Sequence, residues 1–165
     1  RRDPGAAMKQ IPLPEILVIL AMLILLVLTS WALAWADPTE DLYYLALVVA
    51  LEAEGEPTLG KEAVAWVVMN RVKSRQQTVR QVVMASGQFP GLWVPRRVRW
   101  IELAPSAFQV AWAVYTDQTP DPSHGATHYL NERTVLALHG RLPMWFDESR
   151  ITARIGNHTF LRLDR

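Results

Sequence analysis

The stretch DPTEDLYYLALVVALEAEGEP, residues 37–57, decides the fold of this chain. It begins with an Asp cap, a proline at the first helical position and a glutamate three residues after the cap, which predicts the start of a helix. Residues 42–51 are apolar nearly all round apart from two tyrosine hydroxyls, so we expect this helix at the centre of the domain. Gly55 suits the left-handed residue that ends a helix, and Pro57 prevents its continuation.

Three carboxylates, Glu52, Glu54 and Glu56, lie where this helix is expected to end. A carboxyl group in a buried last turn keeps its proton near neutral pH, because desolvation penalises the charged form. A protonated carboxyl is the general acid that cleavage of a glycosidic bond requires. Glutamate-rich helix ends are also common on solvated surfaces. Helical periodicity does not choose between Glu52 and Glu54, because each shares a stripe with apolar residues of the same helix.

A long apolar segment precedes this helix. Residues 16–28 are all apolar, and apolar character resumes after Thr29 and Ser30 as far as residue 36. The segment is long enough to cross a hydrocarbon core of about 30 Å, and basic residues before it predict a cytoplasmic N-terminus. The small-x-small pattern at residues 34–36 fits a signal peptidase site equally well. We therefore expect residues 1–36 to be a signal peptide or a transmembrane anchor, and residues 37–165 to be an exported domain.

The composition excludes several functions. The chain of 165 residues has no cysteine, which rules out disulfides, thiolate metal sites and a cysteine nucleophile. Subtracting the three basic and two acidic residues of the first 36 from totals of 17 and 16 leaves 14 of each, so the exported part is formally neutral. No nucleic-acid partner is indicated. A local basic cluster at Arg96, Arg97 and Arg99 fits either surface packing or a groove for an anionic glycan.

The rest of the domain predicts three further helices and then a small antiparallel sheet, which together define an α+β fold. Thr58 suits the cap of the second helix, with Asn70 and Arg71 near its end. Thr78 and Gln81 suit a capping box, and Gly156-Asn157 suits a two-residue hairpin turn. The expected helices cover residues 59–73, 78–84 and 105–115, and the expected strands cover residues 126–130, 151–155 and 158–163.

Several motifs of the exported domain occur in a recognisable order. They are LEAEGEP at residues 51–57, Gly60, VVMNRV at residues 67–72, Gly87-Gln88-Phe89, Gly125-Ala126-Thr127-His128-Tyr129, Trp145 and Ile155-Gly156-x-His158-x-Phe160. This order closely resembles the spore-cortex-lytic, or SleB-type, cell wall hydrolases. The likeness spans about residues 42–162, which is essentially the whole exported domain.

The resemblance implies a lysozyme-like α+β fold that acts on peptidoglycan glycan strands through a single essential glutamate. By its position in the motif that residue is Glu52. The family is usually described as lytic transglycosylases, which cut between N-acetylmuramic acid and N-acetylglucosamine with one glutamate as acid and then base. Such a reaction needs neither a second carboxylate nor a cofactor. Glu56 is the rival candidate, expected instead to order the turn by binding backbone N–H groups or an arginine, and Glu54 is expected to be solvated.

The resemblance also suggests residues that bind the substrate. Gln88 and Phe89 head a loop that fits contact with sugar rings, although Phe89 fits the hydrophobic core equally well. Thr127 and Tyr129 begin the sheet that forms one wall of the cleft in lysozyme-like folds. His158, just after the hairpin turn, is expected to have a structural role.

Two features of the sequence depart from the usual pattern of the family. The chain has His124 where a glycine or another small residue is expected, and it carries an arginine-rich insertion at residues 94–99. Both leave the fine substrate preference open. Asn70 and Arg71 are expected to cap and tie the second helix, with a catalytic role as the alternative.

Two other classes of function remain as alternatives. A zinc-dependent amidase or peptidase is suggested by His124 and His128, but Gly125 argues against a helix there and no glutamate lies between the histidines. A membrane-tethered protein that binds the wall without turnover is the other. The expected location is on the cell-wall side, either secreted or membrane-anchored. Wall remodelling, germination and phage lysis all fit as biological settings.

Overall fold

The structure, a computed structural model, describes residues 12–33, 38–89 and 105–163, and the chain forms two compact units, residues 1–37 and 38–165. The first unit contains α1 (Leu13–Leu33). The large apolar side chains of residues 13–27 are exposed, as Leu13 is at 75%. Across the described ranges, no helix has the combination of length and apolar character needed to cross a membrane, which leaves the expected transmembrane anchor unsupported.

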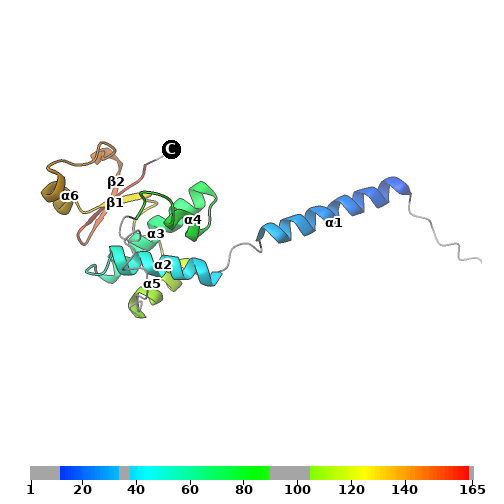
Figure 1. Ribbon diagram of the computed structural model, residues 1–165, viewed down its shortest axis with the longest axis horizontal. Coiled ribbons are helices and arrows are strands. Elements are labelled where there is room, and N and C mark those ends of the chain that lie inside the picture. The colour runs from blue at the N-terminus through cyan, green and yellow to red at the C-terminus, as the bar shows by residue number, and fades with distance from the viewer. Residues whose placement is uncertain (1–11, 34–37, 90–104, 164–165) are drawn as a thin grey trace, which may run out of the picture. The chain divides into compact units, whose positions relative to one another are not determined.

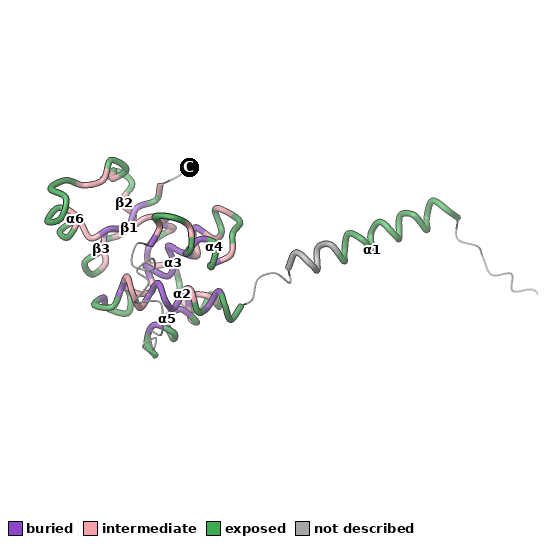
Figure 2. The backbone as a smooth tube through the Cα atoms, viewed as in Figure 1, coloured by how far each residue is buried: buried purple, intermediate pink, exposed green. Residues whose placement is uncertain are grey.

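The second unit is built around α2 (Pro38–Glu52), the helix predicted to be central. It packs against α3 (Thr58–Arg75), α4 (Val79–Val83) and α5 (Pro105–Tyr115). Residues 45–49 in its middle are fully buried, and this part of the helix is purple in Figure 2. The predicted helices at residues 78–84 and 105–115 are confirmed, and Thr78 and Gln81 form the expected capping box of α4.

The three strands form one antiparallel sheet in the order β1-β3-β2. The strands are β1 (His128–Leu130), β2 (Ile151–Ile155) and β3 (His158–Leu161), and the turn between β2 and β3 is the predicted hairpin (Figure 1). Tyr129 lies opposite Phe160 in the register of β1 and β3. Since Phe160 is fully buried in the helical core, the sheet packs one face against the helices. The expected α+β arrangement, helices followed by a small sheet, is confirmed.

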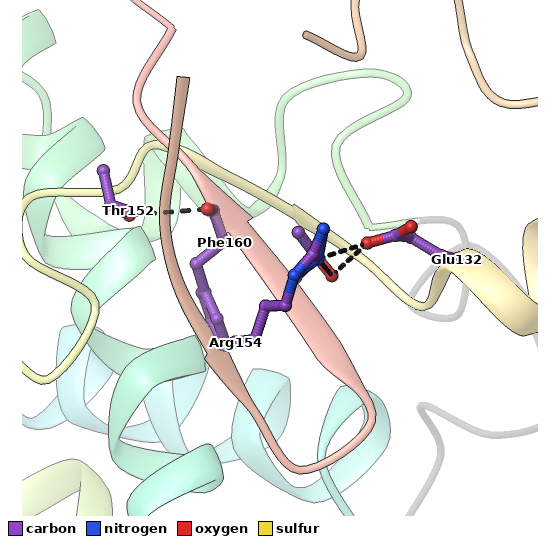
Figure 3. A network of polar contacts seen from close by, with 5 residues as sticks. Glu132, Thr152, Arg154 and Phe160 are labelled. Carbon is purple, nitrogen blue, oxygen red and sulfur yellow. Dashed lines mark hydrogen bonds and ion pairs between the residues drawn. The ribbon is translucent and has the colours of Figure 1, made fainter. Parts of the chain in front are cut away.

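Two elements were not predicted, α6 (Glu132–His139) and the short 3-10 helix η2 (Glu148–Arg150). Both are short, at eight and three residues, and neither buries a residue, so neither contributes to the hydrophobic core. The carboxylate of Glu132 fastens α6 to the sheet, because it accepts hydrogen bonds from Thr159 Oγ1 and, at 2.8 Å, from Arg154 Nη1 (Figure 3). This contact joins the first turn of α6 to the outer face of the hairpin.

Two predicted helix boundaries are wrong. Gly55 does not adopt a left-handed conformation; the helix ends because the chain turns at Ala53, whose carbonyl accepts a hydrogen bond from the Glu56 N–H. Thr58 is the first residue of α3 and makes no capping hydrogen bond, and α3 continues past Arg71 to Arg75. The stop comes one residue later, where Gln76 takes a left-handed φ of 53° and donates its N–H to the Val72 carbonyl.

Candidate active site

Glu52 is the last residue of α2 and is half-buried. The apolar run before it draws the end of the helix into the domain. Burial raises the pKa of the Glu52 carboxyl above its usual range, and a hydrogen bond with the Tyr129 side chain lowers it by less. The carboxyl group is therefore protonated over a wider pH range than an exposed glutamate. Glu54, two residues later, is exposed.

Tyr129 lies in β1 and reaches the end of α2 from the sheet. Its ring packs edge-on against His158, with centroids 5.1 Å apart, and lies 5.9 Å from the ring of Phe160. Burial, and next the charge of Glu52, raise the pKa of Tyr129 well above its usual value. The hydroxyl thus keeps its proton and can donate it in a hydrogen bond to the Glu52 carboxylate.

Arg71 lies beneath this pair, on α3. Its side chain is 5% exposed, and its Nε donates a 2.6 Å hydrogen bond to the Thr127 carbonyl just before β1. The guanidinium carbon lies 5.5 Å from the ring centroid of Phe89, a cation–π distance. Burial first, and also the neighbouring charge of Arg75, lower the pKa of Arg71 to about 10, which still leaves it charged at neutral pH. Its positive charge in turn lowers the pKa of Tyr129.

Glu56 joins the turn after α2 to the β2–β3 hairpin. The side chain is 8% exposed and accepts hydrogen bonds from the Asn157 backbone N–H at 3.0 Å and from Asn157 Nδ2 at 2.9 Å. Glu56 therefore binds a backbone N–H as expected, although this N–H belongs to the hairpin. Its Oε1 also lies 3.5 Å from Nδ1 of His158 without the geometry of a hydrogen bond. Burial lowers the pKa of His158, and the charge of Glu56 opposes that shift, so the imidazole is mainly neutral.

Asp121 organises the chain that leads into β1. Its Oδ1 accepts hydrogen bonds from the N–H and hydroxyl of Ser123, and its Oδ2 accepts from the Gly125 N–H and Asn70 Nδ2, all within 2.9 Å. Asn70 also donates to the Ala126 carbonyl at 3.0 Å. Asn70 and Arg71 thus tie α3 to the segment before β1, as expected, but they do not cap the helix, because α3 continues to Arg75.

The substrate-binding candidates lie in different surroundings. Tyr129 is the candidate whose side chain forms a hydrogen bond with Glu52. Thr127 is engaged with Leu163, donating from its hydroxyl to the carbonyl at 3.2 Å and accepting the N–H at 3.1 Å. Gln88 is half-buried and accepts a 3.5 Å hydrogen bond from Arg75. Phe89 is 1% exposed and its ring packs against Arg71. It therefore lies in the hydrophobic core and is not a surface for contact with sugars.

The zinc site suggested by His124 and His128 is not found within the described part of the chain. No cluster of three or more His, Asp or Glu side chains able to hold a metal is found there. His124 is exposed with a left-handed φ of 54°, and His128 contacts the ring of Trp145 at 5.4 Å between centroids. The basic cluster Arg96, Arg97 and Arg99 and the insertion at residues 94–99 lie outside the described residues.

Comparisons with known proteins show similarity to cell wall hydrolases in both sequence and structure. The sequence model of the cell wall hydrolase family matches residues 55–161. The catalytic domain of the SleB protein of Bacillus cereus is similar in structure, with a TM-score of 0.63 and 27% identity over 75% of this chain and 91% of that domain. The catalytic domain of the germination-specific lytic transglycosylase SleB of Bacillus anthracis gives a TM-score of 0.61 and 27% identity over 78% and 97%. A search of curated proteins finds no match.

The mostly helical domain with its small antiparallel sheet matches the fold of the SleB catalytic domain. The chain belongs to the SleB-type cell wall hydrolase family. Peptidoglycan is the material on which such a hydrolase acts. The range matched by the family model begins after Glu52 and includes Glu56, Tyr129 and His158.

Proposed function

We propose that this chain is a lytic transglycosylase that cleaves the bond between N-acetylmuramic acid and N-acetylglucosamine, with Glu52 as acid and then base. One observation carries the proposal: a single half-buried carboxyl group, with its pKa raised by burial, meets a protonated tyrosine at the junction of α2 and β1. The proposal includes a lysozyme-like placement of the substrate, with the sheet as one wall of the cleft.

The reaction balances with one carboxyl group. Protonated Glu52 donates its proton to the glycosidic oxygen, and the bond from that oxygen to the muramic anomeric carbon breaks, which leaves positive charge on the carbon. The 6-hydroxyl of the same sugar then forms a bond to that carbon, and its proton passes to Glu52. The acid is regenerated and no water is consumed. Tyr129 stabilises the Glu52 carboxylate between the two steps by donating a hydrogen bond to it.

The surroundings of Glu52 favour the one-carboxyl mechanism over a paired one. A partner carboxylate close enough to act as nucleophile or to activate water would raise the pKa of Glu52 by its negative charge. Within the described segments, the influences on the pKa of Glu52 are burial and the Tyr129 hydrogen bond. Glu56 is occupied with Asn157 of the hairpin.

We propose further that the unit of residues 38–165 works outside the cytoplasmic membrane, where peptidoglycan lies. The apolar N-terminal unit, with its exposed α1, supports delivery to that side. The test is protease digestion of intact cells that produce the chain. Degradation of residues 38–165 in intact cells supports the location, and protection until the cells are lysed contradicts it.

Mass spectrometry of the soluble products from purified peptidoglycan tests the chemistry. The full chain is expected to release fragments with 1,6-anhydromuramic ends, and Glu52→Gln is expected to lower turnover at least about 1,000-fold, because the amide has no proton of suitable acidity to donate. Glu54→Gln is the matched control, since it makes the same change two residues away on an exposed side chain. Products with reducing ends instead of anhydromuramic ends would show that the chain is a hydrolase and not a transglycosylase. Equal turnover by Glu52→Gln and the parent would exclude Glu52.

A further inference from the structure

His158, the first residue of β3, contacts both the Glu56 carboxylate and the ring of Tyr129. Its Nδ1 atom lies 3.5 Å from Glu56 Oε1, and the centroid of its ring lies 5.1 Å from that of Tyr129 at an interplanar angle of 84°. The side chain is 11% exposed, so the imidazole has little room to move. His158 thus connects the turn after α2 with the tyrosine that forms a hydrogen bond with Glu52.

The Glu56 carboxylate is a fixed support for this imidazole. Both of its oxygens accept hydrogen bonds from Asn157, and a Cβ added at Gly60 of α3 would lie 3.1 Å from Oε2. Because the carboxylate is held on these sides, its negative charge acts on His158 from a constant position. Nδ1 of His158 has no hydrogen-bond partner among the described residues, so packing and the charge of Glu56 hold the ring.

The ring of Tyr129 is held by two rings of β3. Tyr129 lies opposite Phe160 in the register, and His158 lies two residues before Phe160, on the same face of the strand. The three rings contact one another, since the centroid of Phe160 lies 5.9 Å from that of Tyr129 and 6.2 Å from that of His158. The direction in which the Tyr129 hydroxyl points toward Glu52 therefore depends on both neighbouring rings.

His158 influences this pair by its position and not by its charge. Burial lowers the pKa of His158 more than the charge of Glu56 raises it, so the imidazole is mainly neutral. Among the described residues, the charges that shift the pKa of Tyr129 are those of Glu52 and Arg71. Burial and the Tyr129 hydrogen bond are the influences on the pKa of Glu52. His158 therefore reaches Glu52 through the placement of the Tyr129 ring.

We propose that His158 is a positioning residue for the reaction at Glu52: its ring, held by the Glu56 carboxylate, sets the orientation from which the Tyr129 hydroxyl bonds to Glu52. The inference deepens the proposed function and rests on it, since a benefit to the reaction presupposes that Glu52 carries the reaction out. Loss of the imidazole weakens the hydrogen bond between Tyr129 and Glu52, although both partners remain in the chain.

The test is a double-mutant cycle that combines His158→Ala with Tyr129→Phe and measures the pKa of Glu52. Carbon-13 NMR of the full chain with labelled glutamate gives this pKa, and Glu52→Gln identifies the resonance. His158→Ala is expected to raise the pKa of Glu52, because the hydrogen bond that lowers it is weakened. Turnover of purified peptidoglycan is expected to fall about three-fold, as part of the effect of one hydrogen bond is lost. In the Tyr129→Phe background, His158→Ala is expected to leave both values unchanged.

Two further variants separate positioning from a general loss of structure. His158→Phe keeps an aromatic ring beside Tyr129 and is expected to keep the parent pKa of Glu52. His139→Ala is the matched control, since His139 is an exposed histidine of α6. A cavity that only admitted water to Glu52 would act in the opposite direction from the expected shift, because reduced burial lowers the pKa of a carboxyl group.

The outcomes distinguish this inference from the proposed function. A parent chain that releases no fragments from peptidoglycan overturns the proposed function, whatever the NMR measurement gives. The positioning role is overturned, and the proposed function left intact, if an active parent is accompanied by a Glu52 pKa that His158→Ala leaves unchanged or lowers. An equal shift with and without the Tyr129 hydroxyl, or a His158→Phe variant that behaves like His158→Ala, overturns it as well.

Thermal denaturation of each variant shows that the compared chains are folded. Should His158→Ala not fold, the cycle is run with His158→Leu, which fills more of the space without an aromatic ring. The same shift of the Glu52 pKa, and the same dependence on the Tyr129 hydroxyl, are then expected.

Discussion

At the scale of the residue, the decisive relation is between Glu52 and Tyr129. Burial favours the protonated form of Glu52, which the first half of the proposed reaction uses, and the tyrosine hydrogen bond favours the ionised form, which the second half of that reaction uses. A carboxyl group with only the first influence would donate its proton reluctantly, and one with only the second would have none to donate. The two opposing influences act on the same carboxyl group, with burial as the larger one.

Tyr129→Phe is expected to shift the pH dependence of kcat. The variant loses the hydrogen bond that lowers the pKa of Glu52, so that pKa rises further. Activity requires protonated Glu52 and falls as the pH rises through its pKa, so the alkaline limb of the profile moves to higher pH. The maximal kcat falls about ten-fold, because the carboxylate loses its donor between the two steps.

Tyr43→Phe is the control for this measurement, since Tyr43 is an exposed tyrosine of α2. Its pH profile is expected to match that of the parent. An alkaline limb that stays in place in Tyr129→Phe, or moves to lower pH, would contradict the role assigned to the tyrosine hydroxyl.

Gly156 is the residue on which the contact between Glu56 and the hairpin depends. Its φ is +59°, and a Cβ at this position would overlap the Oε2 atom of Glu56. We expect Gly156→Ala to lower the free energy of unfolding by roughly 2–3 kcal/mol, measured by chemical denaturation, since it adds a steric clash to backbone strain. Gly140→Ala isolates the strain, because Gly140 has a φ of +68° with open space around it. Equal losses in the two variants would show that Glu56 gives way without cost.

At the scale of the element, α3 is held to the segment before β1 by Asp121 and Asn70. Burial is the largest influence on the pKa of Asp121 and raises it, but the hydrogen bonds from Ser123, Asn70 and Gly125 together lower it below its usual value. The ionised carboxylate therefore stabilises the fold, and this contribution is present above about pH 4 and lost as the pH falls through the depressed pKa.

Asp121→Asn is expected to destabilise the domain in a pH-dependent way. At pH 7 the loss is about 1–3 kcal/mol, because an amide accepts hydrogen bonds at one oxygen only and adds an unmatched donor. Below about pH 4 the difference from the parent narrows, since the parent loses its carboxylate there. Urea denaturation at pH 7 and pH 3 measures both values. A constant difference at the two pH values would show that the charge of Asp121 contributes nothing.

The elements differ in how far the sequence could predict them. The helix α2 was predictable because its apolar residues surround it, and α4 because Thr78 and Gln81 form a local capping box. The strands β2 and β3 were predictable from alternating residues around a glycine turn. In contrast, α6 lies on the surface and is held by Glu132 contacts with Arg154 and Thr159 of the hairpin, more than twenty residues away. Such long-range contacts leave no local pattern, but the ends of α6 do, because Asn131 accepts a capping hydrogen bond from the Thr134 N–H and Gly140 ends the helix with a left-handed φ of 68°.

The residues of the candidate site also differ in how far the sequence could predict them. The resemblance to a family singled out Glu52, and the structure adds that a strand residue, Tyr129, is its hydrogen-bond partner. Periodicity could not separate Glu52 from Glu54, because α2 ends at Glu52 and Glu54 lies in the turn after it, where helical periodicity no longer applies.

At the scale of the whole molecule, the chain separates into an apolar N-terminal unit and a unit with its own core. Every described residue of that core lies between Leu42 and Phe160. We expect removal of residues 1–37 to leave kcat/KM on soluble glycan fragments within about two-fold of the parent value and to raise soluble yield, because the exposed apolar side chains of α1 are gone. A cooperative thermal transition in the shortened chain would support this, and a loss of cooperativity would contradict it.

The bond between Glu56 and Asn157 joins residues that are 101 positions apart, and this separation has a consequence for the cell that makes the protein. The ribosome produces α2 with Glu52 long before it produces Tyr129 and the hairpin. A nascent or truncated chain therefore carries Glu52 without its partner strand, as an ordinary carboxylate that is ionised at neutral pH and has no proton to give. On the proposed mechanism, the capacity to cut the wall is acquired only after β1 and the β2–β3 hairpin have been made and have docked, so the order of these elements in the sequence delays the activity.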